Sequence, residues 1–280
     1  MTHPRRVQIL GVAIDDVIEA EAVTRIAAML ESGGAHQICT VNPEFINEAA
    51  RNPCFAEVLA QADLCTADGI GVLLAARYLG TPLRGRVTGV RLTHRLAQLA
   101  AERGYRLFLL GAAPGVAEEA AAVLQAAYAG LTIVGCVAGS PAPHHEPFLQ
   151  QVIRSARPDI LLVAYGHPKQ DLWIARNQPI LQVPVAVGVG GVFDYLAGRV
   201  PFAPAWVRQL GLEWLYRLVS QPRRWRRIID AVPYFCWRVM STAYRLEGAN
   251  PRMFTEYPDV TDDRRKDRRA TPTTRKSPDR

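Results

Sequence analysis

The stretch VPVAVGVGGVFDY, residues 183–195, indicates the fold more directly than the rest of the chain. It begins as a near-continuous apolar run rich in valine and ends in glycines followed by an aspartate. Such a run is typical of a strand that is buried on both faces in a parallel sheet. The glycines lie where the strand should end, which is the edge at which open α/β sheets bind ligands.

Six apolar runs upstream repeat this pattern, with amphipathic stretches between them. We expect strands at residues 7–14, 36–41, 62–67, 105–111, 131–139, 158–166 and 183–190, and helices at 16–31, 89–103 and 114–128. Pro43, Pro114 and Pro168 mark three helix starts, because proline suits the first position of a helix. The alternation predicts a doubly wound, mostly parallel, Rossmann-like α/β sheet covered by helices on both faces.

Polar and glycine-rich residues gather at the C-terminal ends of the expected strands. They are Thr40 and Asn42, Asp68 and Gly69, Gly111, Gly139, Gly166 to Asp171, and Gly188 to Asp194. Helix N-termini at this edge favour anions. The sequence therefore predicts an anion-binding site at this edge.

The chain becomes basic and aromatic after residue 198. Between Arg199 and Arg245 it holds nine arginines against two acids, which accounts for the formal net charge of +7. Trp206, Trp214 and Trp225 are interleaved with them, and residues 206–219 carry an apolar stripe at helical spacing. Such a surface suits an anionic partner, either phosphate or an anionic membrane. Binding to nucleic acid is disfavoured, because the helix that carries these arginines must bury its stripe.

Three parts of the chain follow from these patterns. We expect an α/β catalytic core at 1–198, a basic, aromatic, helical appendage at 199–248 and a disordered tail at 249–280. The apolar run 228–240 is too short to span a bilayer and contains charged residues and a proline. The N-terminus lacks the apolar stretch of a signal peptide. We expect a cytoplasmic protein that associates peripherally with the inner face of the cell membrane.

The five cysteines are odd in number, widely spaced and set in apolar surroundings, without a CxxC pair. This pattern predicts reduced core thiols rather than a disulfide framework or a metal centre. The pair His144-His145 lies in a proline-rich loop without a third ligand, so we predict no metal. The segments GVGGVFD and LLGAAPG lack the spacing of a dinucleotide fingerprint, so we predict no nicotinamide cofactor. An epimerase or a dehydrogenase would need nicotinamide, so the absence of this fingerprint argues against both.

Several polar residues at this edge admit both a chemical and a structural role. Asp68 suits a general base, but its spacing alone favours an N-cap for the helix after it. Asn42, directly before a proline, is likewise favoured as an N-cap. Arg86 is equally plausible as a residue that binds phosphate and as a solvated arginine in a loop. His167 is favoured as an ordinary loop histidine.

The order of motifs resembles the WecG/TagA/CpsF family of bacterial glycosyltransferases from about Val7 to Arg227. The motifs are TVNPEFINEA, ADGIGVLLAARYLGTPLRGRVTGVRL, FLLGAAPGVAEEAA, PDILLVAYGHPKQDLWIARN, VGVGGVFDYLAGRV and APAWVRQLGLEWLYRL with PRRWRR. All six occur in the family's order and at its spacing, which makes the match specific.

This resemblance implies an inverting, metal-independent and cofactor-independent transferase of bacterial surface polysaccharide synthesis. It would move a sugar, typically N-acetylmannosamine or its uronic acid, from a UDP donor to a polyprenyl-diphosphate-linked saccharide. By the same resemblance, Asp68 is the catalytic base. The donor pocket would be lined by Thr40, Asn42, Gln170 and Asp194. Phosphate would be bound by Arg86, Arg217, Arg224 and Arg227, the last three brought over the active site by the appendage.

The sequence departs from the family pattern at two points. Asp171 replaces the glutamate of the family's PKQE motif, and Pro201-Phe202 replaces a basic pair before Ala-Pro. The second change leaves the acceptor and the pathway open. UDP-glucose and UDP-glucuronate remain alternative donors, in an exopolysaccharide pathway. A membrane-associated nucleotide-sugar-binding module without transferase activity is a further alternative.

Overall fold

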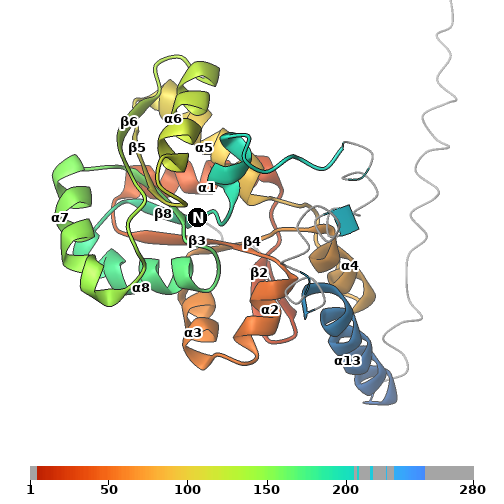
Figure 1. The fold of residues 1–280 in the computed structure, drawn as a ribbon. Helices are drawn as coiled ribbons and strands as arrows, with labels where there is room; N and C mark the ends of the chain where they lie inside the picture. The colour runs from red at the N-terminus through yellow and green to blue at the C-terminus, as the bar shows by residue number, and fades with distance from the viewer. Residues whose placement is uncertain (1–4, 205–206, 208–214, 217–224, 226–229, 250–280) are drawn as a thin grey trace, which may run out of the picture. The chain divides into compact units, whose positions relative to one another are not determined.

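The computed structural model describes residues 5–204, 207, 215–216, 225 and 230–249 (Figure 1). The described elements are β1 (Arg6–Ile9), β2 (Val12–Asp15), α1 (Glu19–Ser32), β3 (His36–Val41), α2 (Pro43–Ala49), α3 (Pro53–Gln61), β4 (Leu64–Ala67), α4 (Ile70–Tyr78), α5 (Gly89–Arg103), β5 (Arg106–Gly111), α6 (Val116–Ala127), β6 (Thr132–Val137), η1 (Pro143–His145), α7 (Glu146–Ala156), β7 (Ile160–Ala164), α8 (Lys169–Leu181), β8 (Val185–Gly188), α9 (Val192–Leu196), η3 (Asp230–Tyr234) and α13 (Phe235–Ala249).

The main sheet has six parallel strands in the order β4-β3-β8-β7-β5-β6. Strand β8, from the stretch 183–195, lies between β3 and β7. Its residues and those of β7 are buried on both faces, which explains their unbroken apolar sequences. The predicted α/β class and parallel sheet are confirmed.

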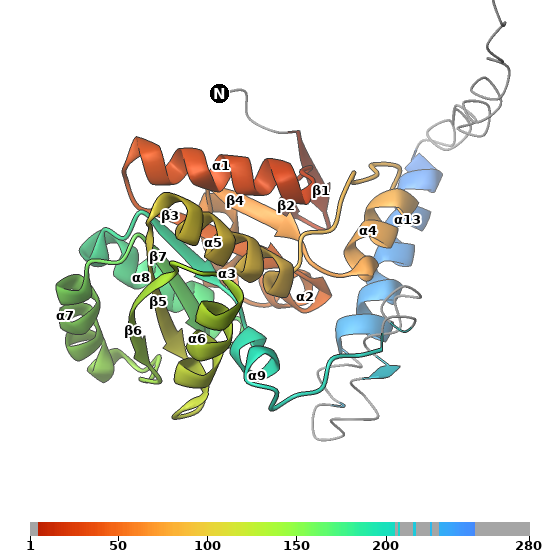
Figure 2. The same ribbon diagram turned by 90° about the horizontal axis from the view of Figure 1, so that it is seen from above.

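Helices cover both faces of this sheet (Figures 1 and 2). Helices α1, α5, α6 and α9 pack with one face into a single apolar cluster. On the other face, α2, α3 and α4 pack beside β3 and β4, whereas α7 and α8 pack beside β5, β7 and β8. Successive residues of a strand point to opposite faces of the sheet, so they contribute alternately to the clusters on the two faces.

The prediction of a single strand at residues 7–14 is wrong. It is a hairpin, in which β1 and β2 pair antiparallel outside the main sheet. Leu10 and Gly11 form its two-residue turn with φ of 50° and 90°. A turn with two positive φ angles matches the twist of the flanking strands, and glycine adopts such a φ without strain.

Two of the three prolines predicted to start helices lie where helices begin. Pro43 occupies the first turn of α2, and Pro168 directly precedes α8. Pro114 lies two residues before α6, because Gly115 caps that helix with φ of 84°.

The five cysteines are free in the structure, but they are not all in the core. Cys39 and Cys65 are buried and Cys136 is half-buried, whereas Cys54 and Cys236 are exposed. The expectation of five core thiols is therefore wrong for two of them. Cys54 lies in the first turn of α3, and Cys236 lies in α13, where each helix presents a face to solvent.

Part of the predicted appendage packs against the core. Phe235 and Val239 of α13 are buried in the cluster formed by the hairpin and α2–α4. Arg238 donates hydrogen bonds to the Ile46 carbonyl (3.2 Å) and to Asn47 Oδ1 (2.9 Å), both on α2. The compact unit that holds the sheet extends to Ala243, and the structure describes residues 244–249 of a second unit.

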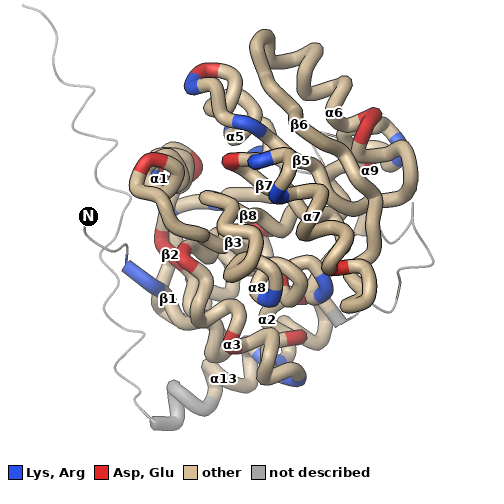
Figure 3. The backbone as a smooth tube through the Cα atoms, turned by 90° about the vertical axis from the view of Figure 1, so that its left-hand side faces the viewer, with Lys and Arg blue, Asp and Glu red and all other residues tan. Residues whose placement is uncertain are grey.

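Acidic and basic residues are interspersed along the described elements (Figure 3). Arg84 pairs with Asp16 and Glu21, and Arg199 pairs with Glu119. Arg199, the first arginine of the basic stretch noted in the sequence, is thus already paired with an acid. Among the described helices, none is long and apolar enough to cross a membrane.

Candidate active site

Thr40 and Asp68 lie at the C-terminal ends of the neighbouring strands β3 and β4. The Thr40 side chain is buried, and its hydroxyl donates to the Gly188 carbonyl at 3.3 Å. A methyl group built on Gly89 would lie 3.7 Å from Thr40 Oγ1, while the Gly89 amide donates to Asp68 Oδ2 at 3.2 Å. Thr40 and Asp68 therefore flank the same glycine at the N-terminus of α5.

The structure corrects the interpretation of Asp68 as the cap of the helix that follows it. The N-cap of α4 is Gly69, with φ of 99° and no side-chain hydrogen bond. Asp68 is half-buried and accepts instead from the first residue of α5, Gly89. The N-terminus of α5 thus directs a backbone N–H group at this carboxylate. A held, partly accessible carboxylate at the ligand edge can accept a proton from a hydroxyl group.

Arg86 enters the same region through a segment bound to β4. The Val87 amide donates to the Ala67 carbonyl at 2.9 Å, and the Thr66 hydroxyl donates to the Val87 carbonyl at 3.3 Å. Thr88 then caps α5 through the Arg91 amide at 3.3 Å. Arg86, half-buried, directly precedes this anchored stretch.

Asn42 is the N-cap of α2, as its position before a proline predicts. Its Oδ1 accepts from the Phe45 amide at 3.1 Å. Pro43 lies against the start of α4, since a methyl group on Gly71 would be 3.2 Å from Pro43 Cγ. The N-termini of α2 and α4 therefore meet at this edge, and both direct backbone N–H groups toward it.

Gln170 connects the ends of β7 and β8. Its side chain is 2 % exposed, and Oε1 accepts from the Gly166 amide (3.1 Å) and the Gly190 amide (2.8 Å). A methyl group on Gly188 would lie 2.5 Å from Gln170 Nε2. In the structure Gln170 holds the two glycine turns; its contact with a donor stays a prediction.

Asp171 is buried behind the same glycine. Burial raises the pKa of Asp171 to about 7, an effect that the adjacent Cys39 thiol and Gln170 amide oppose. The pKa of Cys39 is raised well above its ordinary value, first by its hydrogen bond to the Cys65 thiol and then by burial.

Asp194 is placed at the start of α9, beyond the glycines that follow β8. It is half-buried, and its carbonyl accepts from the amides of Arg199 (2.9 Å) and Val200 (3.2 Å). The next residue, Tyr195, stacks on Phe202 with ring centroids 4.9 Å apart. Phe202, from the Pro201-Phe202 departure, therefore packs on the residue that follows Asp194.

Sequence reasoning did not identify the pairing of His167 with Glu44. His167 Nδ1 lies 3.1 Å from Glu44 Oε2, and the imidazole stacks on Phe45 with centroids 5.3 Å apart. The signal was present in the prolines: Glu44 follows Pro43 and His167 precedes Pro168, so both lie beside helix starts at one edge of the sheet.

The remaining predicted phosphate ligands, Arg217, Arg224 and Arg227, lie outside the described residues. Most of the predicted helix 206–219 does too. Of its apolar stripe the structure describes Val207, which is 5 % exposed, and Leu215, which is 41 % exposed. Leu215 therefore does not follow the predicted burial. In the part of the chain that the structure describes, no cluster of three or more His, Cys, Asp or Glu residues could hold a metal ion.

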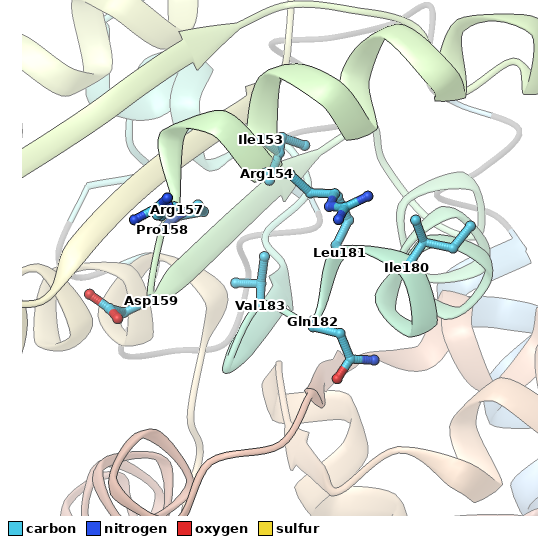
Figure 4. Close-up of a pocket in the computed structure, with 9 residues that line it drawn as sticks. All are labelled: Ile153, Arg154, Arg157, Pro158, Asp159, Ile180, Leu181, Gln182 and Val183. Atoms are coloured by element: carbon cyan, nitrogen blue, oxygen red, sulfur yellow. The ribbon is translucent and has the colours of Figure 1, made fainter.

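A pocket of about 370 Å³ lies at the opposite edge of the sheet (Figure 4). It is lined by residues before β7 and β8 and at the ends of α7 and α8, among them Arg157, Asp159 and Gln182. Ligands of open α/β sheets bind at the carboxyl ends of the strands, so this pocket is not the candidate active site.

The chain is similar to known proteins over most of its length. Residues 7–249 match the model of the glycosyl transferase WecG/TagA/CpsF family. A Bacillus spizizenii protein named N-acetylglucosaminyldiphosphoundecaprenol N-acetyl-beta-D-mannosaminyltransferase is 33 % identical over 223 residues, covering 78 % of this chain and 86 % of that protein. A protein of the same name from Staphylococcus aureus strain MW2 is 29 % identical over 259 residues, covering 89 % and 97 %.

Proposed function

The chain belongs to the glycosyl transferase WecG/TagA/CpsF family, and from this membership we propose that it transfers N-acetylmannosamine from a UDP donor to a GlcNAc-diphosphate-polyprenol acceptor. The named activity of its relatives supports the sugar and the acceptor. The observation that carries the proposal is the half-buried Asp68 carboxylate, held at the ligand edge by the N-terminus of α5.

In the proposed reaction, Asp68 accepts the proton of the acceptor hydroxyl as its oxygen attacks the anomeric carbon. The new C–O bond forms on the face opposite UDP, and the bond to the diphosphate breaks with its electron pair leaving on UDP. The product therefore has inverted configuration. Backbone N–H groups at helix N-termini, together with Arg86 and the predicted Arg217, Arg224 and Arg227, would stabilise the diphosphate charge without a metal ion.

The test is release of UDP from a panel of UDP-sugars in the presence of a short-chain polyprenyl-diphosphate-GlcNAc analogue. Acceptor-dependent release with UDP-N-acetylmannosamine supports the proposal. Release with UDP-glucose or UDP-glucuronate instead would indicate the alternative donor and an exopolysaccharide pathway. Donor binding without release on any acceptor would indicate a binding module, and no binding of any UDP-sugar contradicts the proposed donor class.

Asn42 and Asn52 provide a matched pair for testing the donor pocket. Both are N-caps before a proline, and their Oδ1 atoms accept from the amides of Phe45 and Phe55 at 3.1 and 3.2 Å. Changing either to alanine should lower the free energy of unfolding by about 1 kcal/mol, because one helix amide loses its acceptor. Only Asn42→Ala should also raise the KM for the donor, which steady-state kinetics measures. Equal KM values in the two variants would place Asn42 outside the pocket.

We further propose that α4 and α13 contact the membrane that holds the acceptor. The first part of α13 shares one apolar cluster with α4, which contains Val72 and Ala76 of α4 and Phe235 and Val239 of α13. Leu74 and Tyr78 on α4 are 60 % and 51 % exposed, and Trp237 and Met240 on α13 are 60 % and 53 % exposed. Exposed apolar and aromatic side chains on neighbouring helices are suited to the interfacial layer of a bilayer.

Trp237→Glu should weaken binding to anionic phospholipid vesicles at least tenfold, because it replaces an interfacial aromatic side chain with a negative charge. Co-sedimentation with the vesicles measures this binding. Phe148→Glu is the control. Phe148 is 59 % exposed, nearly as much as Trp237, but it lies on α7, which packs into a different apolar cluster from α13. Equal loss of binding in both variants would contradict docking through α13.

A further inference from the structure

Asp171 is a fully buried acid in the first turn of α8. Its exposed fraction is 0 %, and neither carboxyl oxygen has a hydrogen-bond partner of good geometry. Burial of an ionised carboxylate without a cation carries a large desolvation penalty, so such a group is retained in its neutral form. Asp171 is thus distinct from the other buried acids, Asp15 and Asp16, which pair with Arg6 and Arg84.

The surroundings of this carboxyl contain thiols and amides. Cys39 on β3 and Gln170 on the same helix are the polar groups beside it, and the Cys65 thiol on β4 is hydrogen-bonded to Cys39. On the remaining neighbouring strand, β8, the residue in contact is Gly188. No Lys or Arg of the described residues acts on the pKa of Asp171, which burial raises to about 7.

Gly188 is where this buried group meets the candidate active site. A methyl group at Gly188 would lie 2.6 Å from Asp171 Oδ1 and 2.5 Å from Gln170 Nε2, so both side chains fill the space that a larger residue at Gly188 would need. The carbonyl of Gly188 accepts the Thr40 hydroxyl on the site side. The start of α8 is itself anchored, because Gln37 Nε2 donates to the Asp171 carbonyl at 3.0 Å.

We propose that Asp171 is a positioning residue that works in its neutral form, holding Gly188 and Gln170 so that the glycine turns after β7 and β8 keep the geometry that binds the donor. The inference rests on the proposed UDP-sugar transferase function. Loss of the proton would put an unpaired charge directly behind Gly188. That charge would draw the Gln170 amide toward it and repel an anionic donor.

The test compares wild-type enzyme with Asp171→Asn, a neutral side chain of nearly the same shape. The probe is UDP-N-acetylmannosamine, because its diphosphate is a diester with no second ionisation near neutral pH, unlike free UDP. For wild type, kcat/KM for the donor should fall about tenfold per pH unit above a midpoint near 7. The effect should lie in KM more than in kcat. For Asp171→Asn the same range should be flat, with activity at the acid end retained within about tenfold.

Asp159→Asn is the control for the chemical change itself. Asp159 accepts from the Arg106 amide at 2.7 Å at the opposite edge of the sheet, and this variant should keep the wild-type pH profile. An identical pH profile of kcat/KM in wild type and Asp171→Asn would overturn the inference. If Asp171 were merely structural, its replacement would alter stability without removing the fall in kcat/KM above pH 7.

A second measurement keeps the inference testable if Asp171→Asn does not fold. Calorimetric titration of wild-type protein with the nucleotide sugar should show affinity that weakens through the same pH range. Affinity independent of pH there would overturn the role of Asp171. Absence of binding at every pH would instead contradict the proposed function, so the two failures are distinguishable.

Discussion

Replacing Asp68 with asparagine should lower the rate of sugar transfer by about 10³-fold and leave binding of the UDP-sugar nearly unchanged. Asparagine keeps an oxygen that can accept from the Gly89 amide, so the N-terminus of α5 stays capped. It cannot take the proton of the acceptor hydroxyl, and general-base catalysis contributes about 10²–10⁴ to a rate. The measurements are UDP release and calorimetric titration with the donor.

Asp63→Asn is the matched control, because Asp63 and Asp68 precede and follow the same strand, β4. Asp63 accepts from the Gln37 amide at 3.0 Å at the edge remote from the site. Its replacement should leave turnover within about twofold, as expected for a partly exposed group away from the chemistry. Turnover of Asp68→Asn within tenfold of wild type would assign the base to another residue, and simultaneous loss of donor binding and stability would favour a structural role.

Replacing Gly188 with alanine should damage both stability and donor binding. The added methyl group would lie 2.5 Å from Gln170 Nε2 and 2.6 Å from Asp171 Oδ1, and both side chains are buried. Overpacking of this kind costs about 1–3 kcal/mol. Because Gln170 also holds the amides of Gly166 and Gly190, its displacement should weaken donor affinity more than tenfold. Urea unfolding and calorimetric titration with the donor measure the two effects.

Gly191→Ala provides the comparison for stability. A methyl group there would meet only Asp194 Oδ2, at 3.8 Å, and Gly191 has φ of −82°. Its free energy of unfolding should remain within about 0.5 kcal/mol of wild type. If Gly188→Ala proves as stable as Gly191→Ala and binds the donor normally, the contact between β8 and the first turn of α8 does not constrain the site.

The parallel sheet could be predicted from sequence because β3, β4, β5, β7 and β8 are buried along most of their length, and such strands are mostly apolar. The prediction of a single strand at residues 7–14 failed because this run is also mostly apolar, apart from Gln8, although it forms a hairpin. Gly11 in its middle was the available signal, since a glycine inside an apolar run often marks a turn.

The candidate site was predictable in position and less so in detail. Thr40, Asn42 and Asp68 could be placed at one edge because the carboxyl ends of parallel strands meet there. The burial of Gln170 and Asp171 was not anticipated, because polar residues after a strand usually face solvent. Helical spacing held the signal: Gln170, Ile174, Asn177 and Leu181 recur on the face of α8 that is buried. The partner of Asp68 on α5 could not be predicted, because it depends on how α5 packs.

The pairing of β3 with β8 also has a consequence for biosynthesis. His36 pairs with Val185, so one side of β3 has no partner until most of the core has left the ribosome. Long-range strand pairing is slow, and an unpaired strand edge can associate with other nascent chains. The same pairing brings Thr40 to Gly188. A translation product that stops before β8 would contain Asp68 but not the assembled site, so transferase capacity arises only late in vectorial synthesis.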